Sequence, residues 1–180
     1  MFKYNGTDAR IKTACMDAND IHLFNKLVEK IRQVESFDMS DATPKQIANI
    51  FVKFAESNEY MEIVTYKPVW RRSRAIGYFD PNKPNKIFLN AYRLNRSPAS
   101  YVGNYYHELS HYLSFRSGIY FNHGNNKNPH TKQFTAPYFI GNLAMKLYEE
   151  RDWIDNVEDE IKINTYKTRP LWHRVLFFWR

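Results

Sequence analysis

The segment His107-Glu108-Leu109-Ser110-His111 constrains this chain more than any other part of its sequence. Residues four apart lie on one face of a helix, so the two histidines can direct their imidazoles to a single metal ion. The glutamate lies one step around the helix, beside the position of a water on that metal. This H-E-x-x-H arrangement is typical of metal-assisted hydrolases, in which the histidines hold zinc and the glutamate is the general base. The sequence therefore predicts a zinc site, and the competing interpretation is two surface histidines beside a chance glutamate.

The residues around this motif predict the helix that the metal site needs. Ser97 is a good N-cap, Pro98 suits the first helical turn, and Gly118 is a typical C-terminal stop. Apolar residues recur at helical spacing along the segment: Val102, Tyr105, Leu109 and Leu113. We therefore expect a helix that packs one face on a core and directs His107 and His111 into a cleft.

A third ligand has to come from outside this helix, because catalytic zinc usually has three protein ligands and one position open to water. Two downstream histidines and an acidic residue are candidates. His123 lies in a stretch rich in Asn and Gly, which predicts a loop, whereas His130 begins the next helical segment, where a rigid element can aim its side chain. Phe134, an expected core anchor, would fix that helix start. On this placement His130 is the preferred third ligand and His123 is the alternative.

The N-terminal part of the chain, residues 1–58, is predicted to be helical. Residues 1–18 show no clear period and are expected to form an arm or a short strand. From about Asn19 apolar residues recur every three or four positions, which predicts a helix. The tetrapeptide Thr43-Pro44-Lys45-Gln46 then forms a capping box with proline at the first helical position, so a further helix should begin there.

The core of the domain, about residues 60–150, is predicted to combine a small sheet with two helices. Three runs rich in β-branched and aromatic residues predict strands, antiparallel or mixed, at 62–66, 75–79 and 86–90. The turn Asp80–Asn85 separates the last two, which should form a hairpin. After the H-E-x-x-H helix, a second long helix is expected from about His130 to Trp153, with Pro137 kinking it or marking where its regular part begins. The prediction is one α+β domain over residues 1–180.

The cysteine content and the hydropathy of the chain indicate its cellular compartment and argue against a membrane partner. Cys15 is the only cysteine, so neither an intramolecular disulfide nor a cysteine-based zinc ribbon can form. The N-terminus is polar, without the apolar core of a signal peptide, and no run is long enough to cross a bilayer. We therefore expect a soluble protein of the cytoplasm or another intracellular compartment, without a membrane partner.

The net charge of +7 favours an anionic partner, and nucleic acid is the natural candidate. Two basic stretches would carry this binding. The arginines predicted to contact the nucleic acid are Arg71, Arg72 and Arg74 in the first stretch, residues 61–100, and Arg169, Arg174 and Arg180 in the tail 161–180. Tail arginines alternate with aromatic residues, which can stack on unpaired bases, so single-stranded DNA is favoured over duplex. The competing interpretation is a terminal helix packed on the core, with its arginines merely solvated.

The order of these parts resembles the SprT-like zincin family, which includes the eukaryotic Spartan proteins. The resemblance covers about residues 60–150 and rests on four segments: Ala75-Ile76-Gly77-Tyr78, Ile87-Phe88-Leu89-Asn90, His107–His111 and His130-Thr131-Lys132-Gln133-Phe134. Thr131 stands where the family usually has glycine after the histidine, which keeps His123-Gly124 as a rival. The zinc ribbon of bacterial members is absent.

The resemblance implies a zincin-like fold and a zinc-dependent peptidase that acts on a protein or peptide, with Glu108 as base and His107, His111 and His130 as ligands. In the Spartan branch it implies cleavage of proteins held on DNA. Two other classes stay open. One is a zincin of another branch, ImmA/IrrE-like or antirestriction-type, that acts on a specific regulator. The other is a non-enzymatic nucleic-acid-binding protein with a vestigial zinc site.

The sequence also suggests candidates for the substrate-binding strand and for an oxyanion donor. A substrate peptide could pair with the strand 86–90 or with its hairpin partner, if one of them is a sheet edge. Tyr120 and Tyr138 are candidates for an additional oxyanion donor, and the sequence does not choose between them.

Overall fold

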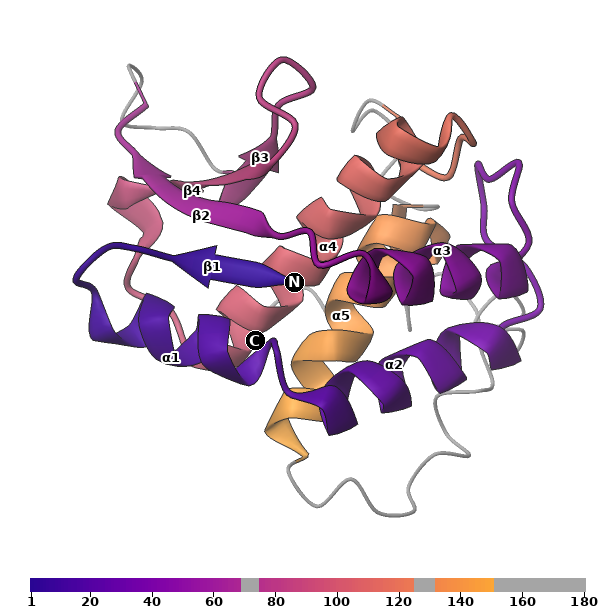
Figure 1. Ribbon diagram of the computed structural model, residues 1–180, viewed down its shortest axis with the longest axis horizontal. Helices are drawn as coiled ribbons and strands as arrows, with labels where there is room; N and C mark the ends of the chain where they lie inside the picture. The colour runs from indigo at the N-terminus through magenta and orange to yellow at the C-terminus, as the bar shows by residue number, and fades with distance from the viewer. Residues whose placement is uncertain (69–74, 125–131, 151–180) are drawn as a thin grey trace, which may run out of the picture.

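A computed structural model describes residues 1–68, 75–124 and 132–150. These residues form an α+β fold of five α-helices and a small mixed sheet of four strands (Figure 1). The strands are β1 (Phe2–Tyr4), β2 (Met61–Tyr66), β3 (Gly77–Phe79) and β4 (Lys86–Asn90). The helices are α1 (Ala9–Asp17), α2 (Ile21–Gln33), α3 (Pro44–Glu56), α4 (Pro98–Ser117) and α5 (Ala136–Glu149), with short 3₁₀ turns at Ala91–Arg93 and Lys132–Phe134.

The sheet has the order β1-β2-β4-β3, so β3 is an edge strand and β4 is interior. β1 runs parallel to β2, and β2 runs parallel to β4, whereas β3 and β4 form the predicted antiparallel hairpin. The three expected strands are present, and the fourth, β1, comes from the stretch that was expected to be an arm or a short strand. Of the two strands considered for a substrate peptide, β4 is paired on both sides, so β3 is the one that meets the condition of being a sheet edge.

The two N-terminal helices that were predicted, α2 and α3, begin close to the expected positions. The Thr43 side chain and Gln46 form the expected capping box at α3, with Pro44 in its first turn. Asp20 caps α2, whose apolar face is buried. Helix α1 was not predicted from the sequence. It is short, so its buried residues (Ile11, Ala14 and Cys15) give too few repeats to indicate a helical period.

Helix α4 runs through the middle of the molecule, between the sheet and helix α5 (Figure 1). It begins at the predicted Ser97 cap and ends at Gly118, which has the left-handed φ of 69° that glycine tolerates best. The predicted apolar stripe is fully or almost fully buried: Val102, Tyr105, Leu109 and Leu113. Tyr106 is buried as well, and its hydroxyl donates a 2.8 Å hydrogen bond to the Ala18 carbonyl. One face of α4 thus anchors the core, and the histidine face remains for a site.

Helices α4 and α5 approach each other closely at Gly103 and Gly141. A Cβ atom on Gly103 would lie 2.7 Å from the Gly141 carbonyl oxygen. A Cβ atom on Gly141 would lie 2.8 Å from the Gly103 carbonyl oxygen and 3.0 Å from the His107 Cβ. Only glycine at both positions lets the two backbones meet. Pro137 lies in the first turn of α5, so it marks where the regular helix begins instead of kinking it.

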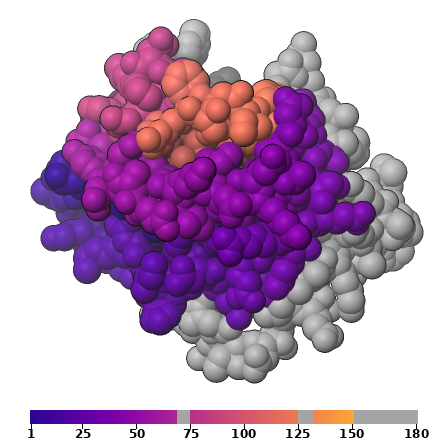
Figure 2. Space-filling view, turned by 45° about the vertical axis from the view of Figure 1, so that its right-hand side comes forward, coloured from indigo at the N-terminus to yellow at the C-terminus, as the bar shows by residue number. Residues whose placement is uncertain are grey.

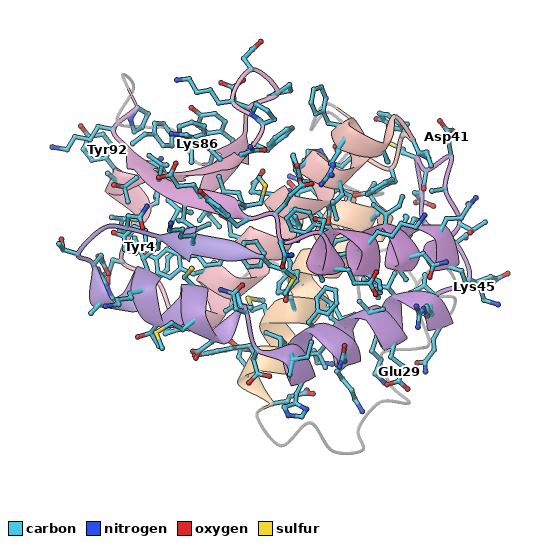
Figure 3. All side chains as sticks on the ribbon, in the orientation of Figure 1. Tyr4, Glu29, Asp41, Lys45, Lys86 and Tyr92 are labelled. Carbon is cyan, nitrogen blue, oxygen red and sulfur yellow. The ribbon has the colours of Figure 1, made fainter. Side chains whose placement is uncertain are left out.

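Several segments of the chain contribute to the outer surface. Figure 2 shows a face dominated by the first 60 residues, with the β3–β4 hairpin and the end of α4 with its following loop above them. Charged side chains such as Glu29 on α2 and Lys45 on α3 are exposed and point outward (Figure 3). Among the described helices, none is long and apolar enough to cross a membrane.

Candidate metal centre

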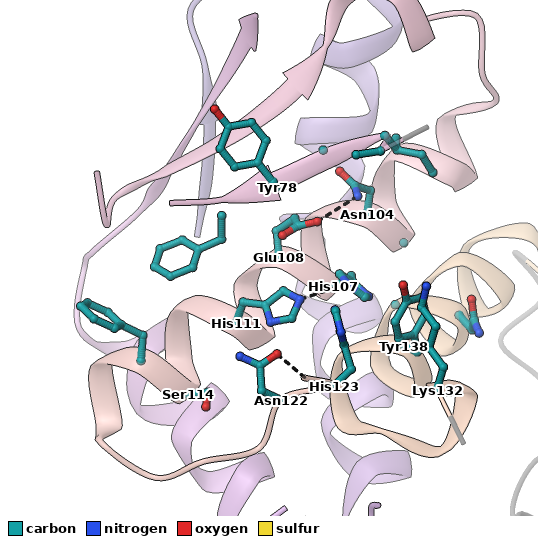
Figure 4. Close-up of a pocket in the computed structure, with 18 of the residues that line it drawn as sticks. Tyr78, Asn104, His107, Glu108, His111, Ser114, Asn122, His123, Lys132 and Tyr138 are labelled. Carbon is teal, nitrogen blue, oxygen red and sulfur yellow. Dashed lines mark hydrogen bonds between the residues drawn. The ribbon is translucent and has the colours of Figure 1, made fainter. Parts of the chain in front are cut away.

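Three histidines converge beside α4. His107 and His111, one turn apart, bring their Nε2 atoms within 3.1 Å of each other. His123, from the loop after α4, places its ring centroid 4.6 Å from that of His111 and 5.4 Å from that of His107 (Figure 4). One ligand atom from each of the three imidazoles lies within 4.8 Å of the others. Two nitrogens bound tetrahedrally at the usual Zn–N distance lie about 3.3 Å apart, so the His107–His111 spacing suits one zinc ion.

Each of the three imidazoles is oriented by a further hydrogen bond. His107 bonds the backbone carbonyl of Pro137, at the start of α5. His111 bonds the side chain of Asn122. The Nδ1 atom of His123 lies 2.9 Å from its neighbour's carbonyl oxygen, that of Gly124. An imidazole that donates one N–H to a carbonyl keeps its other nitrogen as a lone-pair ligand, and such partners are typical of histidines that bind metals.

Asn122 also fixes the loop that carries the third histidine. Its Oδ1 atom accepts a hydrogen bond of 2.9 Å from the backbone N–H of His123 (Figure 4). One side chain therefore contacts both the loop backbone and the His111 ring. The sequence alone does not distinguish Asn122 from the other asparagines of this loop. The available signal was only its place immediately before a histidine in a loop, which is common without any function.

Burial keeps the three imidazoles neutral, which is the form that binds a metal ion. Burial, followed by the neighbouring His111 and His123, holds the pKa of His107 well below its ordinary value. Burial and then His123 lower the pKa of His111 to about 3. The pKa of His123 is also lowered, again mainly by burial. The cluster therefore presents three lone pairs and no positive charge near neutral pH.

Glu108 is buried beside this cluster, with 5% of its surface exposed. Its carboxylate accepts hydrogen bonds from the backbone N–H of Phe79 in β3 and, at 3.4 Å, from Nδ2 of Asn104 one turn earlier in α4. Burial outweighs both bonds and raises the pKa of Glu108 to about 8. A carboxyl group whose pKa lies near neutrality can both take up and release a proton under physiological conditions.

The site opens into a cleft of about 970 Å³. The edge strand β3, the histidine face of α4 and the first turns of α5 contribute residues to its walls. Gly77 permits a close approach, because a Cβ atom there would lie 2.6 Å from Oδ1 of Asn104. This contact brings the start of β3 directly against α4.

Both tyrosines suggested as oxyanion donors line this cleft. The ring of Tyr138 lies 4.5 Å from that of His107 and 4.8 Å from that of His123, between centroids. Lys132, for which the sequence suggested no role of its own, places its Nζ atom 4.2 Å from the Tyr138 ring centroid. Tyr120 is 42% exposed. Tyr138 is thus in contact with the histidine cluster.

The structure brings together His107, Glu108 and His111 as the motif predicts, and it adds His123, the alternative third ligand. His130, the preferred third ligand, lies outside the described residues, so its role stays a prediction. The same holds for the six arginines of the expected nucleic-acid surface: Arg71, Arg72, Arg74, Arg169, Arg174 and Arg180.

No family model, no curated protein and no solved structure matches the chain. Function is therefore argued from the geometry of the site.

Proposed function

We propose that this protein is a zinc-dependent metallopeptidase in which His107, His111 and His123 hold the metal and Glu108 is the general base. The observation that carries the proposal is the convergence of three neutral imidazoles beside a buried carboxylate in an open cleft. Imidazole ligands suit zinc, and three protein ligands leave one coordination position for chemistry. When bound, zinc polarises a carbonyl group and makes water a stronger nucleophile.

Glu108 would supply the proton transfers of peptide hydrolysis. Its carboxylate takes a proton from the attacking water and passes it to the departing amine. The hydrogen bonds from Phe79 and Asn104 hold the carboxylate in place, so that it need not reorient between the two transfers. Tyr138, packed against the rings of His107 and His123, is our candidate for the donor that stabilises the developing oxyanion.

The edge strand β3 is suited to hold the substrate backbone. The Asn90 N–H bonds the Ile76 carbonyl at 2.8 Å, and Tyr78 is paired with Phe88 in the same register. In an antiparallel pair, alternate residues direct their backbone groups to the partner strand, so those of Gly77 face the open edge. We propose that an extended peptide adds to the sheet at Gly77, with its backbone beside Glu108.

The two alternative functions would require either a different set of metal ligands or a different range of substrates. A structural zinc site, as in a non-enzymatic protein, normally has four protein ligands, whereas the described residues supply three at the edge of a cleft. A zincin that acts on one regulator, like the ImmA/IrrE-like peptidases, would have the same centre but would cleave only that regulator. The choice between a narrow and a broad peptidase rests on the substrates that are cleaved.

Removing the metal should abolish the proposed activity. We expect about one zinc ion per chain by elemental analysis of the purified protein. Dialysis against a chelator should eliminate proteolysis of an unfolded test protein and lower the melting temperature, because zinc stabilises the folded state by mass action. Equimolar Zn²⁺ should restore both, whereas Mg²⁺ should restore neither, since it prefers oxygen ligands. Full proteolysis by metal-free protein would contradict the proposal.

We also propose that the substrates include proteins held on DNA, as the net charge of +7 and the resemblance to the Spartan branch suggest. Single-stranded DNA should accelerate cleavage of a DNA-bound test protein, and the effect should fade as salt rises. Replacing Arg169, Arg174 and Arg180 together should weaken both DNA binding and its salt dependence, measured by fluorescence anisotropy. Equal binding by the triple variant and the wild type would contradict this assignment of the arginines.

A further inference from the structure

The two ends of the cleft differ in chemistry. At one end, the start of β3 meets α4 at Asn104, and the polar Ser100 and Asn142 line the wall beside Ile76 and Met145. At the other end, three turns further along α4, the large side chains of the lining are aromatic or aliphatic: Phe79, Phe115, Ile119 and Tyr120, the apolar end, with the small Ser114 and Gly118 among them. Among the described residues, the apolar end carries no charged side chain. The metal cluster and Glu108 lie between the two ends.

Phe115 is placed as part of the site and is not a core residue. It follows His111 by four residues, so it lies on the same face of α4 as the metal ligands. Its side chain is 54% exposed, yet its ring lies 5.8 Å from that of Phe79, between centroids. Phe79 packs in turn on Tyr112, again with 5.8 Å between the ring centroids. The aromatic rings of the apolar end therefore pack on α4 on one side and are open to the cleft on the other.

The edge strand fixes which substrate side chains reach this wall. Tyr78 stacks on Phe88, whereas Phe79 contacts α4, so the two residues point to opposite faces of the sheet. The Phe79 N–H faces the same open edge and bonds Glu108, so a peptide residue opposite Phe79 receives no hydrogen bond from it. The side chain of that peptide residue still points to the same face as Phe79, toward α4. β3 runs from Gly77 near Asn104 to Phe79 near Phe115, so an antiparallel peptide would place its amino-terminal part at the apolar end.

We propose, building on the peptidase function above, that the apolar end binds a bulky apolar side chain on the amino-terminal side of the cleaved bond. Phe79 and Phe115 form its floor, and Ile119 and Tyr120 extend it toward the loop of His123. The substrate class is then an extended peptide with an aromatic or large aliphatic residue before the cleaved bond. Acidic or small polar residues there would leave the wall exposed to water.

The test uses the zinc-loaded full chain and peptides that differ only in the residue before the cleaved bond. Mass spectrometry of the products locates that bond. We expect kcat/KM for Phe or Leu to exceed that for Ser by about tenfold or more. The variant Phe115→Ala should reduce this ratio toward one. Tyr92→Ala, which replaces an aromatic residue that is 44% exposed and does not line the cleft, should leave the ratio unchanged. A preference that survives in Phe115→Ala, or one for the residue after the cleaved bond, would overturn the inference.

A binding experiment separates this inference from the peptidase proposal. The Glu108→Gln variant, loaded with zinc, is titrated against the same labelled peptides by fluorescence anisotropy. It should bind the Phe peptide about tenfold more tightly than the Ser peptide, and adding Phe115→Ala should remove the difference. Equal binding of the two peptides would overturn the apolar end. Selective binding without any cleavage by the wild type would instead overturn only the peptidase function.

Discussion

Replacing Glu108 with Gln is expected to reduce kcat for peptide hydrolysis by about 10²–10⁴-fold, the usual contribution of a general base. Gln has nearly the same shape but cannot take up the proton of the attacking water. Zinc content should not change, because in the proposed site the histidines and not the glutamate hold the metal. The measurements are kcat on a fluorogenic peptide and metal content by elemental analysis, made on the same preparation.

A matched control separates the role of Glu108 from a general loss of negative charge. Glu56, exposed on α3 and away from the cleft, offers the same substitution, and Glu56→Gln should behave as the wild type. Zinc loss in Glu108→Gln would show that this carboxylate is a ligand. Unimpaired hydrolysis would show that another group is the base, and the proposed mechanism would fail.

Replacing His123 with Ala is expected to weaken zinc binding by more than about 100-fold, which exceeds the usual cost of losing an outer partner of a metal ligand. Two imidazoles would remain where a catalytic zinc site needs three protein ligands. Zinc affinity can be measured by competition with a chromophoric chelator, with circular dichroism as the check that the variant is folded. His130→Ala is the matched comparison and should retain zinc. If His130→Ala loses the metal and His123→Ala keeps it, the preference drawn from the sequence was right and the proposed ligand set is wrong.

Local signals in the sequence were sufficient to predict where α4 begins and ends and which of its faces is buried. The cap at Ser97, the stop at Gly118 and the apolar stripe each depend on residues close together in the chain, and all three are confirmed. The hairpin of β3 and β4 is confirmed for the same reason, because a turn with two prolines separates two β-rich runs. The motif also predicted that the two histidines on either side of Glu108 lie together, and their Nε2 atoms are 3.1 Å apart.

Features that depend on contacts between distant segments were not accessible in this way. The strand order, which makes β3 the edge, results from pairing β2 with β4 across the chain. The preference for His130 over His123 assumed that a rigid element aims a histidine better than a loop does, and it stays a prediction because His130 lies outside the described residues. A loop can also position a histidine: the backbone N–H of His123 bonds the Asn122 side chain, and its ring bonds the Gly124 carbonyl, both within the loop itself. No periodicity or composition signals bonds of this kind.

The contact between Gly103 and Gly141 reverses a common rule of protein engineering. Alanine in place of a helical glycine normally stabilises a protein by about 0.5–1 kcal/mol. Here an added methyl group would force α5 away from α4, and with it the Pro137 carbonyl that orients His107. A stabilisation strategy that introduced such alanines by rule would therefore disturb the proposed metal centre. Evolutionary drift should be restrained at these two positions by the chemistry of a histidine, although neither glycine has a side chain that could take part in it.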